Sequence, residues 1–263
     1  MNNFNPHAKK EARIAALKAE AAAKAASTQA DKKDALATRT QLIKPEDAAE
    51  RIRIIFDNSG SMGSSINDSF PGPRRMEEAK KGVVEYLRNC QLNRDAVTVH
   101  FLNSYNRWGI ERGDQKLLSF LDKAELTTDL ILLASSIDNP DIRAIGGTPL
   151  FEVTEQVLDA TPVATRIIMF SDGEPNNTAR KEFCIAQALE KKIPIDTVFI
   201  GSKDEDGAVL LQEIAERTHG IYIVIDSAKG ADFKTAFKYL TPSKRLMLMD
   251  KSFKEKVERG EIR

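Results

Sequence analysis

Five oxygen-bearing side chains stand at positions where they could hold a hard metal ion. Asp57, Ser59 and Ser61 alternate within one short run, Thr148 follows a pair of glycines, and Asp172 lies in a Ser-Asp-Gly run. Two carboxylates and three hydroxyls, without sulfur or imidazole, suit Mg²⁺, with Ca²⁺ or Mn²⁺ as substitutes, and they disfavour zinc. Because Mg²⁺ takes about six ligands, water or an oxygen from another molecule must complete the set.

Each of these motifs also has an ordinary structural interpretation. Ser59 to Gly63 can form a capped turn that starts a helix, and Ser171-Asp172-Gly173 is a common turn sequence. The metal interpretation depends on the whole set, in which none of the oxygen ligands is replaced by alanine or glycine. An intact site can also be purely structural, holding a metal that no partner contacts.

Hydrophobic patterning predicts the elements that position these side chains. Apolar, β-branched runs predict strands at 51–56, 95–103, 165–170, 194–201 and 220–226, and a short edge strand around Tyr105 and Trp108. Helical periodicity predicts helices at 74–92, 113–126, 129–138, 149–160, 178–192 and 206–220. Strands that alternate with helices and are apolar throughout indicate a mainly parallel, doubly wound α/β sheet covered on both faces. Ligands bind such sheets at the carboxyl ends of the strands, so we expect the three motifs to meet there.

The same motifs resemble a known family. Asp57-Asn58-Ser59-Gly60-Ser61-Met62 is similar to the Asp-x-Ser-x-Ser motif of von Willebrand factor type A (VWA) domains, in the form common among intracellular and prokaryotic members. GGTPL (146–150) and FSDGEPN (170–176) resemble the loops that carry the threonine and the second aspartate of that family. The resemblance covers about residues 51–226 and implies a VWA/Rossmann-like fold with a metal-ion-dependent adhesion site (MIDAS).

The resemblance also implies a role for each site residue. Ser59, Ser61 and Thr148 would contact the metal directly, whereas Asp57 and Asp172 often act through bound water. An acidic side chain of a protein partner would fill the remaining position, because mostly neutral ligands leave the ion with residual positive charge. Prokaryotic or phage members of this kind often serve as adaptors for large assemblies or for AAA+ ATPases. The first hypothesis is therefore a metal-dependent, non-catalytic protein-interaction module.

Composition divides the chain into three parts, which we predict to be an N-terminal helical arm and linker (1–50), a VWA domain (51–228) and a C-terminal helix with a basic tail (229–263). The 39 basic and 39 acidic side chains cancel overall. Acidic residues nevertheless outnumber basic ones in the middle part, and basic ones predominate in both flanks. The arm and tail can be solvated or can dock a partner. The second hypothesis is therefore a structural or assembly protein whose flanks make the main contacts. The run at 63–75 can likewise be a mobile loop or a lip that selects the partner.

The sequence argues against an enzyme. A phosphatase of the haloacid-dehalogenase type needs Asp-x-Asp, but the third position is Ser59. The chain has no GxxxxGK[ST] loop, no GxGxxG after a strand and no GxSxG elbow. His7, His100 and His219 are interpreted as structural or solvated.

Nucleic acid and membrane are also disfavoured as partners. The basic tail mixes lysine with glutamate and has no aromatic ladder, so a nucleic-acid-associated factor is the weakest of three hypotheses. No apolar run approaches the length of a membrane span, and the first residues lack the apolar core of a signal peptide. Cys90 and Cys184 fit buried, reduced thiols, so we expect a cytoplasmic setting.

Overall fold

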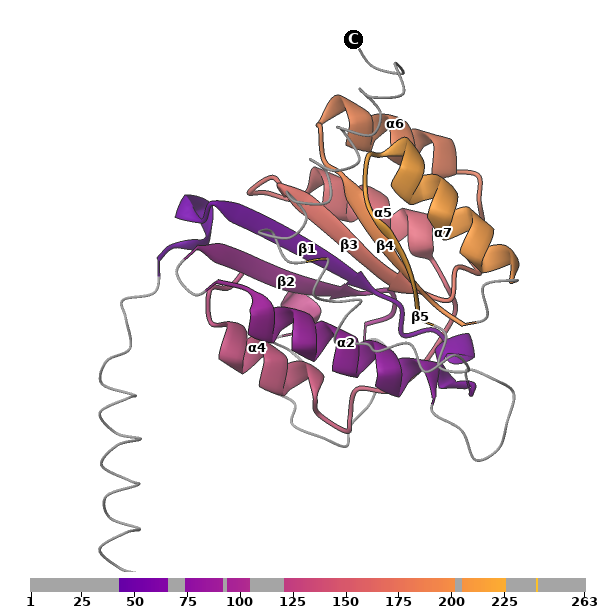
Figure 1. Cartoon of the computed structure of the whole chain (residues 1–263), viewed down its shortest axis with the longest axis horizontal. Coiled ribbons are helices and arrows are strands. Elements are labelled where there is room, and N and C mark those ends of the chain that lie inside the picture. Colours follow the sequence, from indigo (N-terminus) through magenta and orange to yellow (C-terminus); the bar gives the residue numbers. More distant parts are fainter. Residues whose placement is uncertain are drawn as a thin grey trace, which may run out of the picture. The chain divides into compact units, whose positions relative to one another are not determined.

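The described part of the chain is built around one parallel sheet. The computed structural model describes residues 43–65, 74–91, 94–104, 121–201, 205–225 and Leu240. Its strands are β1 (Glu50–Phe56), β2 (Asp95–Phe101), β3 (Arg166–Ser171), β4 (Ile195–Ile200) and β5 (Tyr222–Ile225). All of them pair in parallel, in the order β2-β1-β3-β4-β5. This arrangement confirms the predicted α/β fold class (Figure 1).

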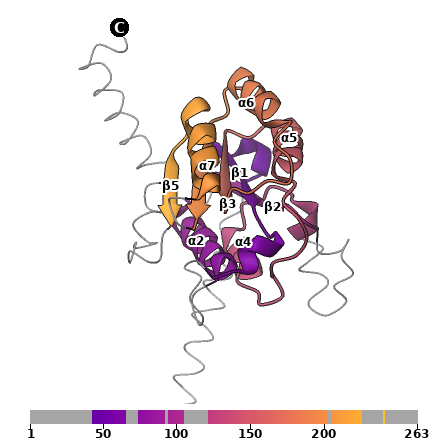
Figure 2. The ribbon, with the colours of Figure 1, turned by 90° about the vertical axis from the view of Figure 1, so that its right-hand side faces the viewer.

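Helices cover both faces of the sheet (Figure 1, Figure 2). On one face α2 (Arg75–Asn89) and α4 (Leu130–Ile137) pack with Ile52, Ile54 and Phe56 of β1. On the other face α5 (Leu150–Asp159), α6 (Lys181–Glu190) and α7 (Asp206–Arg217) pack with Ile55 and with alternate residues of β3 and β4. Because the strands are apolar on both sides, they fit two helical layers and not a solvated face.

The predicted elements agree with the structure except at some ends. Short 3₁₀ helices η1 (Pro45–Asp47) and η2 (Gly60–Gly63) flank β1. The helix predicted at 113–126 is described only from Leu121 onward, and it ends before the predicted residue 126. It is helical only as far as Lys123, because Ala124 takes a left-handed conformation at φ 48° that breaks the hydrogen-bonding repeat.

Several predictions fall outside the described residues. These are the arm, the edge strand around Tyr105 and Trp108, and the basic tail. The chain divides into two units, residues 1–42 and 43–263. The three-part division at 50 and 228 stays a prediction.

A buried ion pair at the amino end of the sheet lies beside Leu240. Arg166, at the start of β3, pairs with the fully buried Asp196 of β4 and donates from a terminal guanidinium nitrogen to the carbonyl of Leu240 at 2.5 Å. Leu240 is helical and wholly buried in the core with α2 and α4.

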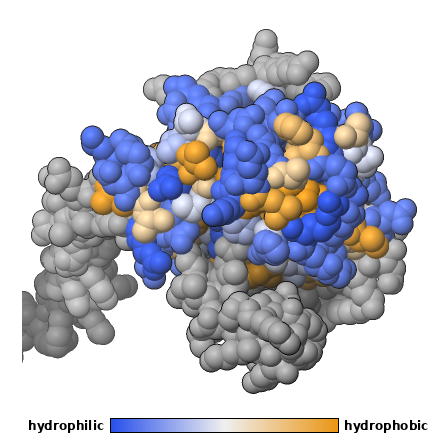
Figure 3. Space-filling model, turned by 90° about the horizontal axis from the view of Figure 1, so that it is seen from above, coloured by the Kyte–Doolittle hydropathy of each residue, from blue (hydrophilic) through white to orange (hydrophobic). Residues whose placement is uncertain are grey.

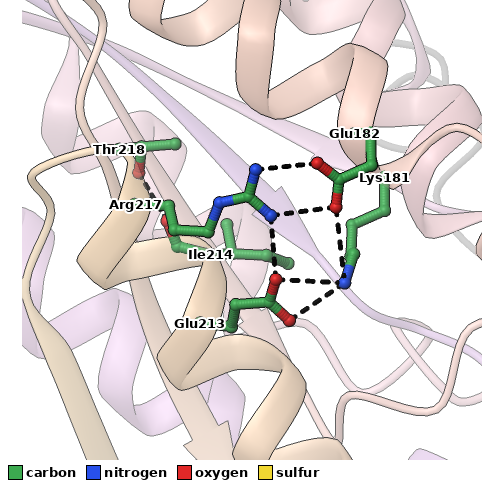
Figure 4. A network of polar contacts seen from close by, with 6 residues as sticks. All are labelled: Lys181, Glu182, Glu213, Ile214, Arg217 and Thr218. Atoms are coloured by element: carbon green, nitrogen blue, oxygen red, sulfur yellow. Dashed lines mark hydrogen bonds and ion pairs between the residues drawn. The ribbon is translucent and has the colours of Figure 1, made fainter.

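Among the described residues, the large apolar side chains that are exposed are Ile131, Leu132, Val163, Phe183, Leu189 and Val209. Figure 3 shows a mainly hydrophilic face with separate hydrophobic patches. On α6 and α7, Lys181, Glu182, Glu213 and Arg217 form a network of ion pairs that ties the two helices together (Figure 4). Within the described residues, no helix combines the length and the apolar character that crossing a membrane requires.

Both cysteines and one histidine lie within the packed strands and helices. Cys90 and Cys184 are free and buried in opposite core layers, and burial raises the pKa of these thiols to about 12 and about 11. His100 of β2 lies beside Arg53 of β1, with 3.1 Å between Nε2 and the guanidinium. Burial and the neighbouring positive charge lower the pKa of His100 to about 4. This agrees with the structural interpretation of His100.

The lowered pKa of His100 predicts a specific dependence of stability on pH. Between pH 6.5 and about 4 the unfolded chain binds a proton at His100 that the folded chain does not bind. The free energy of unfolding should therefore fall as pH falls through this window, by up to about 3 kcal/mol from this group. Urea denaturation at several pH values should show a weaker dependence for His100→Gln. His219→Gln, which removes an exposed imidazole, is the matched control, and equal dependence in both variants would contradict the prediction.

Candidate metal centre

The sheet order creates a switch point between β1 and β3. The chain passes from β1 outward to β2 and then returns to the other side of β1 as β3. At such a point the loops leave the two strands in opposite directions and open a crevice at their carboxyl ends. Asp57 follows β1, and Asp172 follows Ser171, the last residue of β3. The register aligns Phe56 with Phe170, so the two loops start side by side.

Three aromatic rings pack together at the carboxyl ends of the central strands. Phe56 is also aligned with Phe101 of β2. The rings of Phe56 and Phe101 are 5.4 Å apart in an edge-to-face arrangement, and those of Phe56 and Phe170 are 6.3 Å apart. Phe56 and Phe170 are wholly buried, and a low dielectric in such an apolar setting strengthens charge interactions.

Asp57 is wholly buried, and both of its carboxylate oxygens accept hydrogen bonds. The backbone N–H of Ser59 donates to Oδ1 at 2.8 Å, and the hydroxyl of Ser171 donates to Oδ2 at 2.5 Å. The Ser171 hydroxyl itself accepts from the N–H of Gly173 at 2.9 Å. The carboxylate after β1 is thus tied directly to the end of β3 and to the Asp172 loop.

Asp172 is also wholly buried, but its two oxygens differ. Oδ2 accepts from the guanidinium of Arg75 at 3.2 Å, whereas Oδ1 is buried without a hydrogen-bond partner among the described residues. Burial, followed by the negative charge of Asp172, raises the pKa of Asp57 to about 6, although hydrogen bonds from Ser171 and Ser59 oppose the shift. Two neighbouring carboxylates in an apolar setting repel each other, and a cation between them would relieve that repulsion.

The serines of the first loop pair with each other. Ser59 precedes η2, but its hydroxyl does not cap that helix, which removes the capped-turn interpretation for this residue. Instead the hydroxyls of Ser59 and Ser61 lie 2.9 Å apart. Ser59 is buried and Ser61 is half-buried, so the pair lies at the boundary with solvent.

The Thr148 loop is held against the first loop by backbone hydrogen bonds. Gly60 N–H donates to the carbonyl of Gly146 at 3.0 Å, and Ile145 N–H donates to the carbonyl of Asn58 at 2.6 Å. Thr148 N–H donates to Oδ1 of Asn176, whose own N–H donates to the Thr148 carbonyl, both at 3.0 Å. None of these bonds uses the Thr148 hydroxyl.

Two asparagines complete the scaffold. Asn58 donates from Nδ2 to the carbonyl of Asn103 and accepts from its N–H, both at 2.8 Å, so its amide bridges the ends of β1 and β2 like a further ladder pair. The Asn103 side chain in turn donates to the carbonyl of Gly147 at 2.7 Å. The three loops that were predicted to meet therefore do meet. Most of the hydrogen bonds between them involve backbone groups or asparagine side chains.

The five candidate ligands were predicted from the sequence, but the residues that hydrogen-bond to them and to their loops were not. Asn58 and Ser171 stood inside the quoted motifs, so their positions after the strands were a usable signal. Arg75 had no such signal, because it contacts Asp172 and Glu205 across long sequence separations from the first turn of α2. The helix predicted at 74–92 already included Arg75, and α2 confirms this, but the contacts of its side chain with the two acids were not predicted.

The residues present fit a hard divalent cation. The edge supplies hydroxyls, one uncommitted buried carboxylate oxygen at Asp172 and a second carboxylate at Asp57. Among the described residues, no group of three or more His, Cys, Asp or Glu side chains is placed to hold a metal, so the donor set relies on hydroxyls. Such neutral oxygen donors suit Mg²⁺ or Mn²⁺ better than softer metals.

Comparisons with known proteins find likeness in structure only. No protein-family model matches the chain, and neither does any curated protein. A PilB minor pilin from Streptococcus sanguinis is similar over 76% of this chain and 61% of its own, at 11% identity and a TM-score of 0.51. The proximal thread matrix protein 1 of the mussel byssus, solved with a zinc-occupied MIDAS motif, matches 73% of this chain and 46% of its own, at 15% identity and a TM-score of 0.50.

A third structure, BatB from Bacteroides thetaiotaomicron, covers 72% of this chain and 97% of its own, at 20% identity and a TM-score of 0.49. At these identities the likeness shows the fold alone. That fold is a parallel α/β sheet covered by helices on both faces.

The Asp172 loop rests directly on the start of α7. Gly173 takes a left-handed conformation at φ 75°, and a Cβ there would lie 2.3 Å from the carbonyl oxygen of Gly207. A Cβ on Gly207 would lie 2.0 Å from the carbonyl oxygen of Asp172. The two backbones can approach this closely only because both residues are glycine.

Gly207→Ala should therefore destabilise the chain although alanine is the better helix former. The added methyl group meets backbone and not a flexible side chain, so we expect a loss of about 1–3 kcal/mol in the free energy of unfolding. Chemical denaturation measures this change. Gly63→Ala, whose Cβ would lie 3.4 Å from the Ala144 side chain, is the matched control. An unchanged or raised stability of Gly207→Ala would show that the loop and α7 are not in this contact.

Proposed function

We propose that the chain is a VWA-type protein-interaction module whose metal site receives an acidic residue of a partner. Asp57, Ser59, Ser61, Thr148 and Asp172 would hold one divalent cation at the switch point. The observation that carries the proposal is the buried Oδ1 of Asp172, which has no hydrogen-bond partner among the described residues and lies at an edge that already holds the carboxylate of Asp57. A bare buried oxygen of this kind is costly unless a cation or a donor satisfies it.

The chain's own residues define what the bound ion could do. Asp57 is committed to Ser59 N–H and to Ser171, so it serves mainly to fix the first loop and to supply negative charge. The hydroxyls of Ser59, Ser61 and Thr148 are neutral donors. An ion held mostly by neutral donors would keep enough positive charge to attract a carboxylate from outside. The half-buried Ser61 marks the side from which that carboxylate would arrive.

The finer features belong to the same proposal. Mg²⁺ is the proposed ion because the donors are hard oxygens in small number. We propose no catalysis, since the sequence carries neither a phosphate-binding loop nor a nucleophile elbow. The proposed partner is an acidic surface of a large assembly or of an AAA+ ATPase. A cytoplasmic setting is favoured by the two buried thiols, which are kept reduced in that compartment.

Metal binding can be tested with one isosteric substitution. Thr148→Val removes a hydroxyl without changing the shape of the side chain, so Mg²⁺ affinity should fall by about tenfold or more. Isothermal titration calorimetry on the metal-free chain measures this affinity. Thr154→Val makes the same change on α5, where the hydroxyl bonds only the helix carbonyl of Leu150, and should leave affinity unchanged. Absence of Mg²⁺ and Mn²⁺ binding by the native chain would overturn the metal site.

Partner recognition needs a separate measurement on the full chain. A pool of short peptides with a central Asp or Glu is compared with the same pool carrying Asn or Gln, in Mg²⁺ and in EDTA. We expect capture only of the acidic pool and only with Mg²⁺. Metal binding without any preference for the acidic pool would instead indicate that the ion only stabilises the fold.

A further inference from the structure

Arg75 is a cation built into the edge of the candidate metal centre. It is the first residue of α2, and its side chain is only 12% exposed. One terminal nitrogen donates to Oδ2 of Asp172 at 3.2 Å, and the other donates to both oxygens of Glu205 at 3.1 and 3.0 Å. Its planar guanidinium thus joins α2, the Asp172 loop and the residue that precedes α7.

Glu205 and the adjacent backbone contact hold this arrangement in place. Both oxygens of Glu205 accept from one terminal nitrogen of Arg75, and the other terminal nitrogen donates to Asp172, so two separate donors of one planar group join the two acids. Two residues later, Gly207 touches the backbone of Asp172 and Gly173. Asp172 and Glu205 are therefore kept at a fixed spacing, and Arg75 fits between them.

The consequence concerns how many carboxylate oxygens a metal could use. Both oxygens of Asp57 accept hydrogen bonds, and Oδ2 of Asp172 accepts from Arg75. Among the two buried aspartates, only Oδ1 of Asp172 is uncommitted. A metal at this edge would then meet Oδ1 of Asp172, because the hydrogen bond from Arg75 fixes the orientation of the carboxylate and places a positive charge beside Oδ2.

This limit separates two common ions. Ca²⁺ takes six to eight oxygens and readily accepts a bidentate carboxylate, whereas Mg²⁺ requires a compact octahedron and uses single carboxylate oxygens with water. We propose that Arg75 is a specificity-determining residue that makes the site select Mg²⁺ over Ca²⁺ by occupying Oδ2 of Asp172. The proposal rests on the proposed metal site. Arg75 does not touch the ion and acts only through the orientation of Asp172.

The positive charge of Arg75 adds a second, less selective effect. A guanidinium beside the site repels any divalent ion, so removing it should raise the affinity for both ions. Freeing Oδ2 should help Ca²⁺ more than Mg²⁺, because only Ca²⁺ gains a bidentate ligand. The ratio of the two affinities therefore reports the orientation of Asp172 separately from the charge.

The test compares full-length Arg75→Met with the native chain. Bound Mn²⁺ is followed by electron paramagnetic resonance and displaced with Mg²⁺ or with Ca²⁺, which gives the ratio of the two affinities. We expect Arg75→Met to shift this ratio toward Ca²⁺ by about tenfold. Arg88→Met, an exposed arginine on the same helix, is the matched control and should keep the native ratio.

Arg75→Lys is a second variant for the case that Arg75→Met does not fold, because lysine keeps the positive charge. A lysine cannot hold Glu205 and Asp172 together in the same fork, so its ratio should also shift toward Ca²⁺. A native ratio in every folded Arg75 variant would overturn the role of Arg75 while leaving the metal site intact. Absence of Mn²⁺ binding by the native chain would instead overturn the proposed function itself.

Discussion

The whole carboxyl edge depends on the burial of Asp57. A carboxylate without solvent contact must find donors within the fold, because an unsatisfied buried charge costs several kcal/mol. Asp57 finds one donor in its own loop, at Ser59, and one on the neighbouring strand, at Ser171. The first bond shapes the loop that leads into η2, and the second ties β1 to β3 beyond the last ladder pair. Ser59 in turn contacts Ser61 through its hydroxyl, and Ser171 accepts a hydrogen bond from the N–H of Gly173.

Asp172 shows the opposite solution to the same problem. Its carboxylate is satisfied on one side by Arg75 and left bare on the other. Of the four carboxylate oxygens of Asp57 and Asp172, Oδ1 of Asp172 is therefore the one without a hydrogen-bond donor. In a metal-binding interpretation this atom is the natural point of attachment. The side-chain hydrogen bonds of Asn58 and Asn103 support this interpretation. They fix three loops without using the hydroxyls of Ser59, Ser61 or Thr148, so these hydroxyls stay available to a metal.

Local patterns were enough to predict the elements and the edge at which the motifs meet. The strands are continuous apolar runs, so a parallel sheet with two helical layers follows, and with it the convergence of the loops after 56 and 170. Helix ends were predicted less well where backbone conformation decides them, as at Ala124. The contacts of Arg75 could not be predicted, because they arise from packing between α2 and the start of α7 and correspond to no pattern in the sequence. The assignment of ligands at Asp57 or Thr148 likewise stays a prediction from the sequence.

The anchoring of Leu240 has a geometric consequence for any partner. Its carbonyl is held by Arg166 at the amino end of β3, while Ser171 marks the carboxyl end of the same strand. At about 3.3 Å per residue the two ends lie roughly 17 Å apart. Leu240 is therefore held near the end of the sheet opposite the two aspartates. A ligand bound at the aspartate edge would lie a full strand length away from the bond between Arg166 and Leu240.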